Sequence, residues 1–293
     1  MLMTSLLPVA IAMALYILPI GLLLALVKLA RRLSRHKDRR NPLTREHLRQ
    51  PGHTVRAALE DAHFEILATA MATAPLPLFI YVELQGAHWQ TTWLVIFGIF
   101  IAVGSAQLAR KIFLLVRRSR KLQLGLDAEV AVGQELTALM PEGFWVFHDV
   151  KGGGPFNVDH VVVGRHGLFA VETKGRAKRI RESGGGHRLT LKDGRLEFPG
   201  WVETKPLEQA RRNAAWLGEW LSSALGEPIR ATPVLAIPGW YIERRSRSDV
   251  AVINGKSVAG YFTKSGAAEL TEKQVAQIRH QLDARCRDVA LHA

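Results

Sequence analysis

Cysteine is nearly absent from this chain of 293 residues, which contains Cys286 alone. A single cysteine cannot form an intramolecular disulfide, so a disulfide-stapled secreted domain is excluded and a reducing compartment is expected for the soluble part. Zinc-motif spacing is missing too, because His148, His160 and His166 form no Cys or His pair at the intervals of a structural zinc site. The sequence therefore argues against folds that depend on cross-links or on zinc.

Two further families of motif are lacking. The chain has neither a Walker-type phosphate loop nor a Gly-x-Ser-x-Gly elbow, which disfavours a nucleotide triphosphatase and a serine hydrolase. The glycine-rich stretch 152–155 is not placed between a strand and a helix as a phosphate loop would be. It is either a flexible connector or a loop that lets a phosphate approach closely.

Acidic residues are scarce relative to basic ones. The chain has 26 Asp and Glu against 39 Lys and Arg, which gives a formal net charge of +13 and a pI near 10.3. Such a balance indicates an anionic partner, either nucleic acid or a phospholipid surface.

Long hydrophobic runs, in contrast, occur at residues 6–29, 64–82 and 93–108. The first is longer than the apolar core of a signal peptide and has no basic segment before it, so we expect a retained membrane span. Only residues 83–88 separate the other two runs, which predicts a helical hairpin. For the weaker run at 64–82, a buried or interfacial helix remains the alternative.

Basic residues follow the first and third runs. They are Arg31, Arg32, Arg35, Lys37, Arg39 and Arg40 after the first, and Arg110, Lys111, Arg117, Arg118, Arg120 and Lys121 after the third. By the positive-inside rule, both flanks are cytoplasmic. We expect a transmembrane region at 1–121 in the inner (cytoplasmic) membrane, with a cytoplasmic linker at 30–63, and a cytoplasmic domain at 122–293. The same clusters suit anionic lipid headgroups or, alternatively, nucleic acid.

Apolar periodicity predicts an α/β domain after Leu122. A helix is indicated by apolar residues three or four positions apart as far as Leu139. Three strands are then expected at 144–150, 158–164 and 168–174, followed by a helix at 206–225. A buried strand at 232–237 completes the order helix, three strands, helix, strand.

The remaining segments carry recognisable turn and capping signals. Runs 179–182 and 188–191 flank a glycine-rich stretch and predict a hairpin, and Asp193-Gly194 predicts a tight turn. The spacing of Thr271 and Gln274 predicts a capping box at the start of a last helix, 271–285.

Charged side chains converge at the ends of two of the expected strands. Asp159 shares a strand face with Val161, and Glu172 and Lys174 project from one face of the next strand because side chains alternate with period two. If the two strands pair, two carboxylates and an ammonium meet at one sheet edge. Carboxylates are hard oxygen ligands for Mg²⁺, and a nearby lysine can orient a water or balance charge on a phosphate. The pattern is that of a metal-dependent phosphodiesterase.

Glu129 lies on the inward stripe of the first helix, at three- or four-residue spacing from the apolar residues. It is either part of this site or an exposed acid near a helix N-terminus, where the helix dipole favours negative charge.

Four blocks in order resemble the nuclease-related domain (NERD) branch of the PD-(D/E)XK nuclease superfamily. They are Gly125-Leu126-Asp127-Ala128-Glu129, His148-Asp149-Val150, Asp159-His160-Val161-Val162-Val163-Gly164 with Gly167-Leu168-Phe169-Ala170-Val171-Glu172-Thr173-Lys174, and Pro206-Leu207-Glu208-Gln209. The resemblance covers about residues 122 to 225 and implies a restriction-endonuclease-like core. Ala128 stands where the family favours glycine.

The resemblance also implies roles for the matched residues. Asp159, Glu172 and the Thr173 carbonyl would hold Mg²⁺ or Mn²⁺, and Lys174 would orient the attacking water. Glu129 would complete the ligand set directly or through water. Gln209 would reach toward the site, although a solvated position at a helix start is its alternative.

Basic residues around the motif could track phosphates; they are Lys151, Arg165, Arg176, Lys178 and Arg179. We therefore expect a membrane-anchored, metal-dependent endonuclease that acts on nucleic acid, DNA rather than RNA. Two alternatives remain: a non-catalytic module that binds nucleic acid or a partner, and a membrane scaffold that associates through its hairpin.

Overall fold

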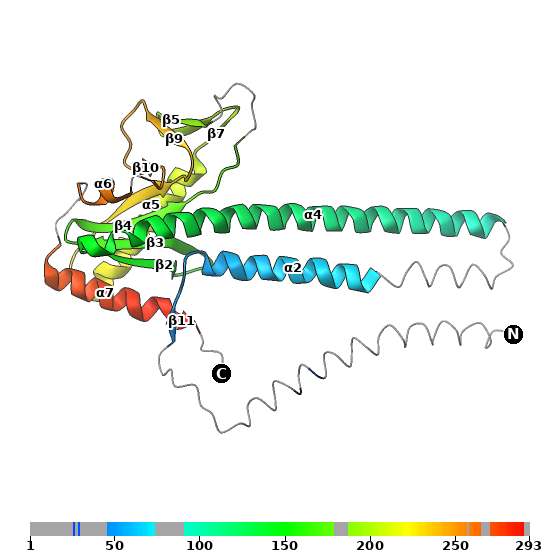
Figure 1. Cartoon of the computed structure of the whole chain (residues 1–293), viewed down its shortest axis with the longest axis horizontal. Helices are drawn as coiled ribbons and strands as arrows, with labels where there is room; N and C mark the ends of the chain where they lie inside the picture. The colour runs from blue at the N-terminus through cyan, green and yellow to red at the C-terminus, as the bar shows by residue number, and fades with distance from the viewer. Residues whose placement is uncertain are drawn as a thin grey trace. The chain divides into compact units, whose positions relative to one another are not determined.

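The computed structural model describes residues 46–73, 91–178, 187–256, 258–264 and 270–289, together with Leu26 and Leu29 (Figure 1). Its contacts divide the described chain into two compact units. The first contains residues 60–73 and 91–120, and the second contains residues 46–59 and 121–289. Each unit is described by itself.

The first unit consists of helical segments with many exposed apolar side chains. They belong to α2 (His53–Thr73) and α4 (Thr91–Thr137). Phe64 and Phe100 are 73% and 75% exposed. The helical stretch Gly98–Glu142 is long and apolar enough to cross a membrane, judged by length and composition, with a mean hydropathy of 1.7 and 6% of its apolar window buried.

The three expected spans stay predictions. The run at 6–29 falls outside the described residues except for Leu26 and Leu29, and so does the part of the second run after Thr73. The third run, 93–108, lies wholly within α4.

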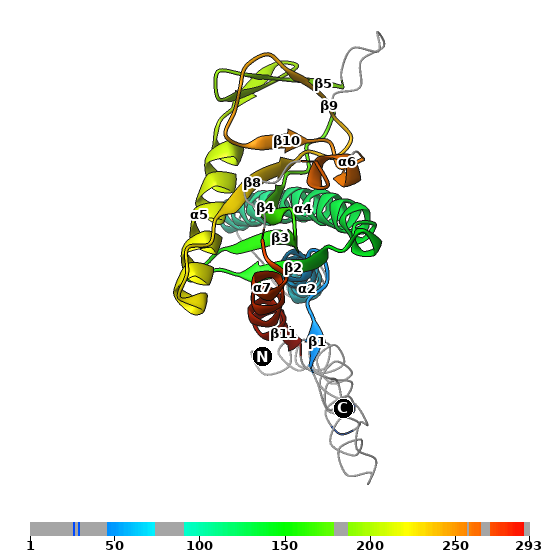
Figure 2. The same cartoon turned by 90° about the vertical axis from the view of Figure 1, so that its left-hand side faces the viewer.

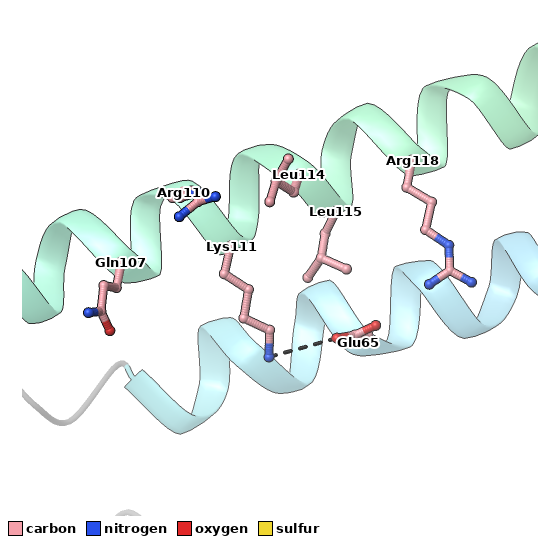
Figure 3. Close-up of a pocket in the computed structure, with 7 residues that line it drawn as sticks. All are labelled: Glu65, Gln107, Arg110, Lys111, Leu114, Leu115 and Arg118. Carbon is pink, nitrogen blue, oxygen red and sulfur yellow. Dashed lines mark ion pairs between the residues drawn. The ribbon is translucent and has the colours of Figure 1, made fainter.

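A groove of about 430 Å³ lies on this unit, between α2 and α4 (Figure 3). One ion pair crosses it, between Lys111 Nζ and Glu65 Oε1 at 3.7 Å. The other lining residues are Gln107, Arg110, Leu114, Leu115 and Arg118. The groove thus combines three cations with aliphatic side chains.

The second unit is built on a five-stranded sheet in the order β10-β8-β4-β3-β2. The strands are β2 (Trp145–Lys151), β3 (Asn157–Gly164), β4 (Gly167–Thr173), β8 (Ala231–Ala236) and β10 (Ala251–Ile253). β2, β3 and β4 pair antiparallel, whereas β8 is parallel to both β4 and β10. All seven residues of β4 are buried, as expected for a central strand covered on both faces.

Helices cover both faces of this sheet, as Figure 2 shows. On one face, α5 (Lys205–Leu225) and α7 (Glu272–Cys286) pack their apolar residues against alternate residues of β3 and β4, among them Val161 and Ala170. On the other face, the end of α4 and the short α6 (Val258–Phe262) pack on the opposite residues, such as Val162 and Val171. The period of two therefore assigns Asp159 and Glu172 to the face of α5.

A second sheet of four strands has the order β7-β6-β5-β9. Its strands are β5 (Arg188–Lys192), β6 (Arg195–Phe198), β7 (Trp201–Glu203) and β9 (Tyr241–Arg244). The expected Asp193-Gly194 turn joins β5 to β6 with positive φ at both residues, 48° and 70°. The first arm of the expected hairpin at 179–182 lies outside the described residues.

The α/β class is observed, and the order helix, three strands, helix, strand appears as α4, β2 to β4, α5 and β8, with β5 to β7 of the second sheet inserted between β4 and α5. A 3-10 turn, η1 (Met140–Glu142), joins α4 to β2. At the start of α7, Thr271 and Gln274 form the expected capping box.

Residues 46–59, expected within a linker, belong to the second unit. β1 (His47–Leu48) pairs antiparallel with β11 (Arg287–Val289), at the end of the described chain. Arg49 follows, with only 7% of its surface exposed. Polar and charged contacts hold this segment, and apolar periodicity gives no signal for such contacts.

Candidate functional site

The antiparallel ladder of β3 and β4 ends with the pair His160 and Val171. Asp159 and Glu172 are the residues that follow this last pair on the two strands. The Asp159 carboxylate also accepts a hydrogen bond from the Thr173 backbone N–H, at 2.6 Å from Oδ2. Asp159 and Glu172 therefore lie near each other where β3 begins and β4 ends.

Glu172 is almost fully buried, and both of its carboxylate oxygens accept hydrogen bonds. Lys174 Nζ donates to Oε1 at 2.6 Å, and Asn213 Nδ2 of α5 donates to Oε2 at 2.7 Å. Just beyond β4, the Lys174 backbone N–H donates to the Ala236 carbonyl at 2.9 Å. The lysine is therefore held beside the acid from its backbone as well as from its side chain.

The chain leaving β4 passes close to α4, which brings Glu129 to the same region. A Cβ on Gly175 would lie 2.5 Å from the Leu124 carbonyl oxygen and 3.1 Å from the Ala128 Cβ. Only glycine fits at 175, and only a small residue fits at 128. Ala128, which stands where the family favours glycine, is therefore small enough for this contact.

Glu129, Asp159 and Glu172 share this region with Lys174, and the pKa of each of the three acids is raised. Burial, then the charges of Asp149 and Glu172, raise the pKa of Glu129 to about 7. Burial and the charges of Glu172 and Glu129 raise the pKa of Asp159 well above its ordinary value, against the opposing effect of Lys174. Burial also raises the pKa of Glu172, although Lys174 and Arg212 counteract it. The site therefore holds more carboxyl groups than its single lysine can keep ionised.

A fourth acid, Asp149, adjoins the cluster. Its Oδ2 accepts hydrogen bonds from Arg49 at 3.2 Å, the Thr54 backbone at 3.0 Å and the Thr54 hydroxyl at 2.6 Å. Its Oδ1 accepts one from Asn157 Nδ2 at 2.9 Å. No role is predicted from the sequence for Asp149, Arg49, Thr54 or Asn157.

Gln209 and Asn213 lie one turn apart on α5, and only Asn213 reaches Glu172. Gln209 is half-buried, and its side chain forms no hydrogen bond with the described residues. Asn213 is 3% exposed. The signal for Asn213 was its four-residue spacing from Gln209, which puts both on one helix face.

His148 and His160 lie on the sheet face opposite to the one that carries Asp159. His148 and His160 contact each other through their Nδ1 atoms at 2.9 Å on the opposite sheet face, and burial lowers the pKa of His148 to about 4. His166 stacks on Phe144. Across the described part of the chain, no group of three or more His, Cys, Asp or Glu side chains is arranged to hold a metal ion.

Several of the expected phosphate-tracking residues pair with acids instead. Lys151 pairs with Asp288, Arg165 with Glu272 at 3.3 Å and Arg176 with Glu203 at 2.6 Å. Lys178 is exposed, and Arg179 lies outside the described residues.

Two neighbouring arginines of α5 also differ in whether they pair with an acid. Arg211 pairs with Asp249 at 2.6 Å. Arg212 is exposed and forms no ion pair with the described residues, and its charge lowers the pKa of Glu172. Arg212 is therefore a free cation beside the acid cluster.

These residues fall within a region that matches a known family. The family model of the nuclease-related domain (NERD) matches residues 124–238. The resemblance expected from the sequence is confirmed for this region, which holds Glu129, Asp159, Glu172, Lys174 and Asn213. Arg49 and Thr54 lie before the NERD match, and Asp288 lies after it. No curated protein and no solved structure matches this chain.

Proposed function

We propose that the NERD region hydrolyses phosphodiester bonds of nucleic acid with the help of Mg²⁺ or Mn²⁺. The observation that carries this proposal is the proximity of Asp159 and Glu172 at the adjoining ends of β3 and β4, with Lys174 Nζ donating a hydrogen bond to Glu172 at 2.6 Å. The match to the nuclease-related domain supports the same class of function.

The chemistry of the donors suits a hard divalent cation, although the acids are not arranged around one in the described chain. Carboxylate oxygens are the ligands that Mg²⁺ prefers, and Asp159 Oδ1 accepts no hydrogen bond from the described residues. Burial raises the pKa of all three acids, and the charges of neighbouring acids add to it for Asp159 and Glu129. A cation between the acids would favour their ionised forms. Asp159, Glu172 and the Thr173 carbonyl would hold it, with Glu129 as a direct or water-linked partner. A bound divalent cation polarises the scissile phosphate and lowers the pKa of a bound water.

Side chains of the protein would orient the water, transfer the proton and contact the substrate. Lys174 donates hydrogen bonds and would orient the attacking water or a phosphate oxygen. Glu129, with its pKa near 7, would hold or release a proton close to neutral pH. Asn213 fixes the Glu172 carboxylate, and Arg212 would contact the substrate phosphate.

The test is cleavage by the full-length chain, purified in detergent, of labelled single- and double-stranded DNA and RNA. We expect cleavage that requires Mg²⁺ or Mn²⁺, with DNA preferred, and at least a hundredfold loss in Lys174→Ala and Asp159→Ala. Lys273→Ala, an exposed lysine of α7, is the matched control. Full activity in Lys174→Ala would contradict the proposal. Salt-sensitive binding without metal-dependent cleavage would instead favour a non-catalytic binding module.

We also propose that the first unit anchors the protein in the inner membrane, with the NERD region in the cytoplasm. One support is the set of apolar side chains exposed on α2 and α4, because exposure of a large apolar surface to water is unfavourable. The other is the run of basic residues that follows the apolar part of α4 and ends at Lys121. Protease digestion of sealed, inside-out vesicles tests it: the NERD region should be degraded there and protected in right-side-out vesicles.

A further inference from the structure

We propose that a strap formed by residues 49–54 completes the candidate site, with Arg49 and Thr54 as positioning residues for Asp149. The inference rests on the proposed nuclease function and goes beyond it, because the strap lies outside the region matched by the NERD model.

The strap holds the Asp149 carboxylate by three donors. Arg49 Nη1 contacts the Asp149 carbonyl oxygen at 2.9 Å and Oδ2 at 3.2 Å, and Thr54 donates to Oδ2 from both its backbone and its hydroxyl. The Thr54 hydroxyl oxygen also accepts from Asn157 Nδ2 at 2.7 Å. Asp149 has φ of 51°, a conformation that non-glycine residues rarely adopt. The contacts of the strap therefore stabilise a backbone geometry that the isolated strand would not prefer.

The strap backbone also forms the wall beside Glu129. Gly52 is buried with φ of 70°, and a Cβ there would lie 2.4 Å from Leu126 Cδ1 and 3.6 Å from Glu129 Oε2. The preceding Pro51 packs on Gly133, where an added Cβ would lie 2.5 Å from Pro51 Cγ. The strap thus contacts α4 along the turn that carries Glu129.

The far end of the strap is anchored to the C-terminal segment. Arg49 Nε and Nη2 donate to the two carboxylate oxygens of Asp288 at 2.7 and 3.0 Å, and the Arg49 backbone N–H donates to the Cys286 carbonyl at 3.0 Å. Asp288 also pairs with Lys151, at the end of β2. A single arginine therefore joins Asp149 and Asp288. A fragment starting at residue 122 would lack it and leave a buried carboxylate short of donors.

Thr54→Val tests the strap with little change in shape, because it removes the hydroxyl and keeps the β-branch. The full-length chain is assayed for Mn²⁺ binding by the loss of the free-ion electron paramagnetic resonance signal, and separately for DNA cleavage. We expect about tenfold weaker Mn²⁺ binding and a similar loss of cleavage, because the Asp149 carboxylate, whose charge acts on Glu129, would no longer be held in place. Thr54→Ser should restore both, and the thermal midpoint should stay within a few degrees of the wild type.

Thr137→Val is the matched control, since Thr137 is an exposed threonine whose hydroxyl bonds only to a carbonyl of its own helix at 2.8 Å. Arg49→Lys should behave like Thr54→Val, because an ammonium cannot reproduce the forked contacts to two acids. Wild-type Mn²⁺ binding and cleavage in Thr54→Val would overturn the strap inference alone. A wild-type chain that neither binds Mn²⁺ nor cleaves would overturn the proposed function and this inference together.

Discussion

The side-chain amide of Asn213 donates to Glu172 Oε2 at 2.7 Å, and both side chains are buried, at 3% and 1% exposure. Glu172 has Lys174 on its other oxygen, so its carboxylate is fixed from two elements at once. Loss of either donor would free the carboxylate to rotate. The orientation of the central acid therefore depends on α5 as well as on β4.

Asn213→Ala should lower cleavage by about ten- to hundredfold, the usual cost of removing a group that orients a metal ligand. The thermal midpoint should also fall by a few degrees because a buried carboxylate oxygen loses its partner. The measurement is the initial rate of DNA cleavage as Mn²⁺ is titrated. Gln134→Ala on the exposed side of α4 is the control. An unchanged metal dependence would show that Asn213 serves packing only.

The sequence was sufficient to place the acids that lie on regular elements. A period of two predicts that Glu172 and Lys174 share a face, and helical spacing predicts that Glu129 faces inward. Both expectations rest on local geometry, which the neighbouring residues determine. The apolar runs at 158–164 and 168–174 also predicted the strands observed as β3 and β4.

Contacts between distant segments could not be predicted in the same way. Arg49 and Asp149 are 100 residues apart in sequence, and Asn213 and Glu172 are 41 apart. Nothing in the local pattern of either partner specifies such a pair. The segment 46–59 was expected within a linker because it lies between the first two apolar runs, whereas Arg49 and Thr54 attach it to the domain through hydrogen bonds.

The adjacent arginines Arg211 and Arg212 of α5 give a second prediction. Arg212→Ala should weaken DNA binding and cleavage several-fold and reduce the salt dependence of binding, because a free cation near Glu172 is lost. Arg211→Ala should change neither, since Arg211 is engaged by Asp249. Fluorescence anisotropy with labelled DNA in EDTA, at increasing salt, measures binding apart from catalysis. Equal effects of the two substitutions would argue against a phosphate contact at Arg212.

The raised pKa of Glu129 gives a pH-dependent prediction. The pKa of Glu129 is about 7 in the folded chain, against 4.5 for an ordinary glutamate. Between these two pH values, Glu129 is therefore mostly protonated in the folded chain and mostly ionised in the unfolded chain. Stability from this group is therefore greatest at low pH and is lost as the pH rises through about 7. We expect the thermal midpoint in EDTA to fall by several degrees between pH 6 and pH 8.

Two comparisons isolate this effect. Glu129→Gln, which cannot ionise, should show a smaller fall over the same range. Saturating Mn²⁺ should also reduce the fall in the wild type, because a cation favours the ionised carboxyl. Identical pH profiles for wild type and Glu129→Gln would show that Glu129 does not titrate in this window.

The groove between α2 and α4 gives the last prediction, which concerns lipid. Arg110, Lys111 and Arg118 line it beside Leu114, a combination suited to an anionic headgroup with its acyl chains on the neighbouring apolar surface (Figure 3). We expect phosphatidylglycerol to raise the thermal midpoint of the detergent-solubilised chain more than phosphatidylcholine does. Arg110→Gln with Arg118→Gln should abolish the difference. Arg117→Gln with Arg120→Gln, exposed residues outside the groove lining, should preserve it. A loss of the lipid effect in both double variants would indicate general charge attraction rather than a headgroup site in the groove.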